Sequence, residues 1–133
     1  MKSLFKILLV FLSFYLFSCA ESQENSTAPY GERLLGAWVH PVYKENVVSY
    51  EKGTGLIAND YGILFQANHV FTDRNSGFCG TPPLTFMNSN GTWEVNKTII
   101  TINMSSEFNQ LEGKQWKIIL LQDQVLKLEP MNN

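Results

Sequence analysis

The sequence predicts an all-β protein that forms a small antiparallel up-and-down β-barrel of about eight strands. Short apolar runs alternate with turn residues along the chain, as in antiparallel sheets, and no window shows a sustained 3.6-residue period with helix caps. Consecutive hairpins favour an up-and-down order, and closing such a sheet removes its two exposed edges. An open two-layer sandwich is the alternative architecture.

Extended segments separated by turn residues fill the second part of the chain. We expect strands at residues 35–43, 45–51, 61–66, 69–74, 84–87, 92–95, 98–104, 115–121 and 125–129. The third and fourth of these form a hairpin across Asn68, a residue that adopts the left-handed conformation of tight turns. Asn90-Gly91 is a strong hairpin signal and predicts a further turn at residues 88–91.

The N-terminus has the order of a secretory signal. A positively charged start is followed by the apolar run 7–17, then by a small residue and a cysteine. The run is too short to span a bilayer comfortably. Leu16-Phe17-Ser18-Cys19 resembles a bacterial lipobox, in which cleavage precedes the cysteine and the new N-terminal cysteine carries lipid. The alternative is a simple secretory signal that is cleaved a few residues after Cys19.

These features divide the chain into a signal peptide (1–18), a lipidated cysteine with a flexible polar tether (19–33) and a β-barrel domain (34–130). We expect the protein to be held by lipid on Cys19 in the bacterial cell envelope, at the outer membrane. Glu21 and Glu24 resemble an export signal to the outer face, although a generic polar tether is the alternative.

Composition excludes some partners. Only 17% of the residues are charged and the net charge is −2, so no basic patch is available to bind nucleic acid through its phosphates. The chain has two cysteines. If Cys19 carries lipid, Cys79 has no partner within the chain, and we expect it to be a buried, inert thiol rather than a reactive or intermolecular one.

Several short motifs occur in the order of one protein family. Leu35-Gly36-Ala37-Trp38 is similar to the Gly-x-Trp opening of lipocalin-type barrels. Further matching segments are Gly62-Ile63-Leu64-Phe65, His69-Val70-Phe71 with Arg74, residues 77–83, residues 91–95, Trp116-Lys117-Ile118 and Leu126-Lys127-Leu128. Together they resemble the small lipocalin-like lipoproteins of Bacteroidetes-type bacteria. The resemblance implies an antiparallel barrel with a cavity at one end, and no particular ligand.

The same resemblance gives Trp38 a role. It implies that this indole closes one end of the barrel and packs against a cation, for which Arg74 and Lys127 are the candidates. The alternative is that Trp38 is an ordinary core tryptophan.

Other aromatic residues lie in the predicted strands. They are candidates to line a ligand cavity, or else they fill the interior completely, as a barrel this small allows. The residues are Phe65, Phe71, Phe86, Trp93 and Trp116.

No motif for catalysis is present, so we expect no enzymatic activity and no cofactor. The sequence lacks a nucleophile elbow, a phosphate-binding loop and a dinucleotide fingerprint. Nothing in the spacing of His40 and His69 brings these two histidines together, so we expect no metal site. Asp60, Asp73 and Asp123 are expected at turns, where aspartate has a structural role.

Two functions are the leading hypotheses for a monomeric, membrane-anchored domain, and an enzyme whose site leaves no local motif is a third, less favoured one. In the first, the barrel binds a small hydrophobic or amphipathic molecule through its interior aromatic residues. In the second, the barrel is solid, and the loop of residues 75–83 contacts another envelope protein or a polysaccharide. The size of the interior void distinguishes the two.

Overall fold

The computed structural model of the protein describes residues 29–76, 82–104 and 113–131. The signal segment, Cys19, the tether up to residue 28, the central part of the 75–83 loop and Cys79 lie outside the described residues. Within the described part, the expected antiparallel barrel is confirmed, and the sheet is closed rather than split into two layers. No helix in this part of the chain is long and apolar enough to cross a membrane.

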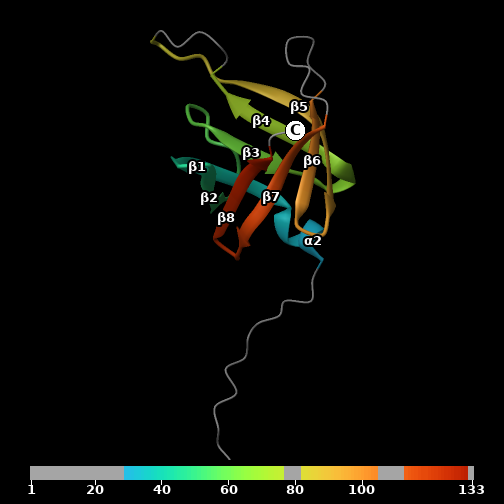
Figure 1. The fold of residues 1–133 in the computed structure, drawn as a ribbon. Helices are drawn as coiled ribbons and strands as arrows, with labels where there is room; N and C mark the ends of the chain where they lie inside the picture. The colour runs from blue at the N-terminus through green and yellow to red at the C-terminus, as the bar shows by residue number, and fades with distance from the viewer. Residues whose placement is uncertain (1–28, 77–81, 105–112, 132–133) are drawn as a thin grey trace, which may run out of the picture.

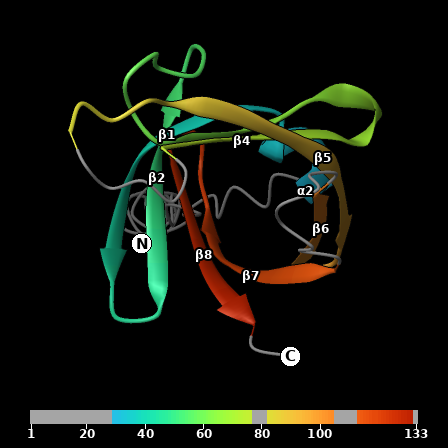
Figure 2. The same ribbon diagram turned by 90° about the horizontal axis from the view of Figure 1, so that it is seen from above.

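Eight strands form the closed barrel. Figures 1 and 2 show how the strands are arranged around it. Around the ring the order is β1-β2-β8-β7-β6-β5-β4-β3, and each neighbouring pair is antiparallel. The strands are β1 (Gly36–Lys44), β2 (Val47–Gly53), β3 (Gly62–Phe65), β4 (Val70–Asn75), β5 (Met87–Asn96), β6 (Ile99–Met104), β7 (Lys114–Leu121) and β8 (Val125–Met131).

One connection departs from the expected up-and-down order. β2 and β3 are consecutive in the chain, but β1 lies between them in the barrel and β2 pairs with β8. Because both strands are antiparallel to β1, they run in the same direction and cannot form a hairpin. Residues 54–61 carry the chain back past β1, where Asp60 Oδ2 lies 2.7 Å from His40 Nδ1 and the Ala58 backbone oxygen accepts hydrogen bonds from Arg74.

The prediction of a turn at residues 88–91 is wrong. These residues lie inside the continuous strand β5, which merges two predicted segments and begins only at Met87. The close approach of the β5 and β6 backbones requires a glycine at position 91, because a Cβ atom there would overlap the backbone oxygen of Asn103 on β6. A glycine in a strand often marks such an approach rather than a turn.

One end of the barrel is closed by a short helix and a packed core. The helix α2 (Tyr30–Leu34) places Leu34 fully inside, and the Leu34 backbone oxygen accepts a 2.8 Å hydrogen bond from Trp38 Nε1. The Arg33 guanidinium donates to the Leu121 backbone oxygen at 2.6 Å, which ties α2 to the β7–β8 end. The folded domain therefore begins earlier than the expected residue 34.

A β-bulge in β1 sets which side chains face inward. His40 and Pro41 together oppose the single residue Tyr50 of β2, and the extra residue shifts the alternation of the strand. As a result, Trp38 faces the interior at the closed end and Tyr43 faces it at the other end. A second irregularity in β7 shifts the alternation of that strand too.

We predict that Gly91→Ala destabilises the fold by about 1–3 kcal/mol, because the added methyl group meets backbone that cannot move aside. Chemical denaturation of both variants measures this. The matched control is Gly55→Ala, where a Cβ atom has no neighbour within 4 Å. Equal stabilities of the two variants would contradict the close β5–β6 approach.

Candidate ligand-binding site

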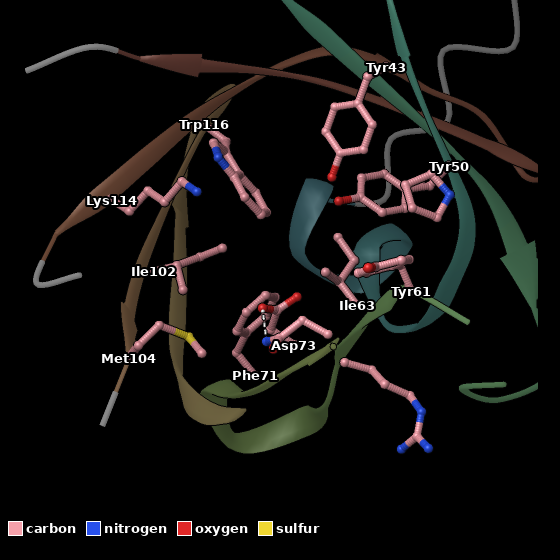
Figure 3. A pocket seen from close by; sticks show the side chains of 14 residues that line it. Tyr43, Tyr50, Tyr61, Ile63, Phe71, Asp73, Ile102, Met104, Lys114 and Trp116 are labelled. Carbon is pink, nitrogen blue, oxygen red and sulfur yellow. Dashed lines mark hydrogen bonds between the residues drawn. The ribbon is translucent and has the colours of Figure 1, made fainter. Parts of the chain in front are cut away.

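A cavity of about 240 Å³ occupies the end of the barrel opposite α2. Its walls come from β1, β2, β3, β4, β6 and β7 together with Tyr61, which directly precedes β3, and Figure 3 shows the side chains that line it. The volume is slightly below the ~300–1,000 Å³ typical of pockets for drug-sized ligands. The site therefore suits a small molecule, or one end of a larger one. The lining residues are Pro41, Tyr43, Tyr50, Tyr61, Gly62, Ile63, Phe71, Asp73, Arg74, Asn75, Ile102, Met104, Lys114 and Trp116.

The base of the cavity is apolar. Ile63, Phe71 and Ile102 lie on β3, β4 and β6, and each side chain is at most 2% exposed. Phe71 packs edge-on against the Trp116 ring at a centroid distance of 6.4 Å, so the base continues into the β7 wall. Such a surface favours the apolar part of a ligand, because burying it removes apolar area from water.

A carboxylate stands directly above this base. Asp73 follows Phe71 by two residues in β4, so both side chains face inward, while the intervening Thr72 faces outward and bonds Asn90. Burial raises the pKa of the Asp73 carboxyl, and this outweighs the opposing effects of a 2.8 Å hydrogen bond from Asn75 Nδ2 and of the Lys114 charge. The expectation that Asp73 occupies a turn is therefore wrong.

Two tyrosine hydroxyl groups face the cavity from β1 and β2. Figure 3 shows the oxygens of Tyr43 and Tyr50 pointing into the same space. Burial raises the pKa of both phenols, and the Asp73 charge raises them further. Both hydroxyls therefore stay protonated at neutral pH and can donate as well as accept hydrogen bonds.

The positively charged side chain of Lys114 lines the cavity from β7, at the open end of the barrel. Lys114 is the first residue of β7 and pairs with Ile102, and its Nζ lies 5.0 Å from the centroid of the Trp116 ring. The Lys114 side chain is exposed. The polar groups thus gather at the open half of the cavity, above the apolar base.

The five aromatic residues that were predicted to line the cavity lie in three different places. Phe71 and Trp116 line the cavity. Phe65 and Trp93 pack edge-to-face in the closed half, 5.2 Å apart, where they fill the interior. Phe86 precedes β5 and packs against Tyr61 at 5.1 Å, outside the cavity lining.

The cation that stacks on Trp38 is Lys52. Its Nζ lies 4.1 Å from the indole centroid and donates a 2.5 Å hydrogen bond to the Leu35 backbone oxygen. Lys52 pairs directly with Trp38 across the β1–β2 ladder, so both face inward at the closed end. The predicted partners Arg74 and Lys127 do not contact it, because each alternates with inward-facing neighbours and points outward.

The two histidines lie on different elements, His40 within β1 and His69 at the end of the β3–β4 connection. His40 sits in the β1 bulge beside Asp60, and His69 Nδ1 lies 3.0 Å from the Trp93 backbone oxygen. Among the residues that the structure describes, no group of three or more His, Cys, Asp or Glu side chains is placed to hold a metal ion.

Comparisons with models of known protein families, with curated proteins and with solved structures find no match. The cavity itself is therefore the basis for inferring function. Most of its polar residues were missed from the sequence, although one signal was available: once Phe71 is placed inward, alternation places Asp73 and Asn75 on the same face.

We predict that Asp73→Asn stabilises the domain at neutral pH, by a Tm rise on the order of a few °C. Because the folded-state pKa lies above the ordinary value of 3.8, the native protein binds more protons than the unfolded chain between the two values, and stability falls as pH rises through this window. Thermal melts of the two proteins should differ at neutral pH and converge below pH 3.8. A variant less stable than wild type at neutral pH would contradict the inward placement of the charge.

Proposed function

We propose that the protein is an envelope-anchored lipoprotein with a lipocalin-like barrel that binds a small amphipathic ligand. The observation that carries this proposal is the cavity at the open end of the barrel, with an apolar base and polar groups above it. Ligand pockets in proteins have this composition, in which apolar walls supply binding energy and a few polar groups fix orientation.

The two halves of the interior differ in a way that supports ligand binding over a purely structural barrel. The closed half is filled by side chains such as Leu34, Trp38 and Phe65, each of which is at most 1% exposed. The open half instead has an unfilled volume, which is lined by the half-buried Asp73 and by the exposed side chains of Tyr43 and Lys114. These polar groups do not fill the open half of the interior, and a molecule bound in the cavity would contact them.

This arrangement disfavours the solid-barrel alternative, in which the protein acts through its outer loops alone. That hypothesis requires an interior filled by side chains along the whole axis. A void of about 240 Å³ is far above the volume of one water molecule, about 30 Å³ in the liquid.

The position of α2 suggests how the domain is presented. The described chain begins at Pro29 and enters the barrel through α2 at the closed end, as Figure 1 shows. A lipid anchor on Cys19 would therefore attach to the closed end and leave the cavity directed away from the membrane. In this orientation the ligand arrives from the aqueous side rather than from the lipid layer.

We predict that the soluble domain, residues 20–133, binds the neutral amphiphile 4-phenylbutan-1-ol, and that Ile102→Phe weakens this binding by about tenfold or more. The larger ring at Ile102 projects into the cavity base. Isothermal titration calorimetry measures the affinity. The matched control is Ile119→Phe on the outer surface of β7, where the side chain is 45% exposed.

Binding that is equally strong in the two variants would place the ligand outside the cavity. Failure of the wild-type domain to bind the alcohol, together with no small molecule in organic extracts of the purified protein, would contradict the proposed function.

We also predict that Cys19→Ala releases the protein from membranes, because the acyl chains on this cysteine would provide the anchor. Fractionation of cells that express the two forms, followed by immunodetection, measures the membrane-bound share. Cys79→Ala is the control, since it removes the other cysteine and should leave membrane association unchanged. Continued membrane association of the Cys19 variant would contradict lipid anchoring.

A further inference from the structure

We propose that the cavity selects cationic amphiphiles, in which the ammonium group of an alkyl or aromatic amine binds the Asp73 carboxylate. The apolar body of the ligand would pack on the base formed by Ile63, Phe71 and Ile102. This inference rests on the ligand-binding function proposed above and names the class of ligand.

Asp73 is a partly buried charged group on the cavity wall. Its carboxylate faces the cavity, and among the described residues it forms no salt bridge. Its hydrogen bond from Asn75 Nδ2, at 2.8 Å, comes from an amide that carries no compensating charge. A partly desolvated carboxylate of this kind gains most from an incoming cation, because charges interact more strongly away from bulk water.

The surrounding aromatic rings reinforce the preference for positive charge. Tyr43, Tyr50, Tyr61, Phe71 and Trp116 all line the cavity, as Figure 3 shows. The face of each ring carries the negative part of its quadrupole, which attracts ammonium groups within about 6 Å of the centroid. Lys114 already occupies such a position over Trp116, at 5.0 Å.

The positive side chains near the cavity oppose this preference only weakly. Lys114 is exposed, so solvent screens its charge, and its ammonium group lies over Trp116. Arg74 directs its guanidinium to the Ala58 backbone oxygen and to Asn88 Oδ1, at 2.8 Å for the latter. Neither is paired with Asp73, so the carboxylate remains available to a ligand.

The experiment compares three ligands that share one apolar body and differ in charge: 4-phenylbutylamine, 4-phenylbutan-1-ol and 4-phenylbutanoate. Calorimetric titration uses residues 20–133, which contain every helix and strand of the described structure. We expect the amine to bind at least about tenfold more tightly than the alcohol, and the carboxylate to bind most weakly.

Two cavity variants and one surface control identify the group responsible. Asp73→Asn should lower amine affinity by about tenfold while alcohol affinity changes less than about twofold. Lys114→Gln should increase amine affinity, because it removes the positive charge that lines the cavity from β7. Asp123→Asn removes an equal charge from the exposed β7–β8 turn at the closed end, and should leave the amine preference unchanged.

The outcomes separate the two proposals. If none of the three ligands binds, the proposed function fails. If the alcohol binds but the carboxylate binds as tightly as the amine or more tightly, the cavity binds ligands and the preference for cations is wrong. Equal loss of amine affinity in Asp73→Asn and Asp123→Asn would also overturn the inference, because it would reduce the effect to overall charge.

Discussion

Closure of the sheet is the constraint on which the rest of this structure depends. β1 pairs with β2 on one side and β3 on the other, and β2 pairs with β8, so the ring has no free edge. A ring of eight strands encloses an interior that is either filled by side chains or left with room for one small ligand. The ladder register then decides which residues face inward, and the bulge at His40 and Pro41 shifts that alternation so that Trp38 and Tyr43 both do so.

The same ring contains two environments. In the closed half, Trp38 is held by its bond to the Leu34 backbone oxygen and covered by Lys52, and apolar side chains fill the space. In the open half, Asp73 and two tyrosines face an unfilled volume. Burial raises the pKa of Asp73, which means that its ionised form costs the fold stability. A cation bound in the cavity would offset that cost, which links the stability of the barrel to the proposed ligand.

The sequence patterns located most of the strands, but they did not show which strands pair with each other. Alternation and turn residues located the β-structure, and Asn68 correctly marked the β3–β4 connection, where its φ is 60°. Gly91 was misread as a turn because a close approach between strands leaves the same local signature. The reversal at residues 54–61, the Lys52–Trp38 contact and the inward face of Asp73 depend on cross-strand register, which joins residues far apart in the chain.

The three tryptophans provide the most direct test of a barrel that is packed at one end and hollow at the other. Trp38 Nε1 donates to the Leu34 backbone oxygen and Trp93 Nε1 to that of Gln66, at 2.8 and 3.0 Å, whereas Trp116 lines the cavity. NMR measurement of indole N–H exchange with solvent should find slow exchange for Trp38 and Trp93 and fast exchange for Trp116. Equal protection of all three would mean that the interior is solid throughout, and equal exposure would mean that no closed core exists.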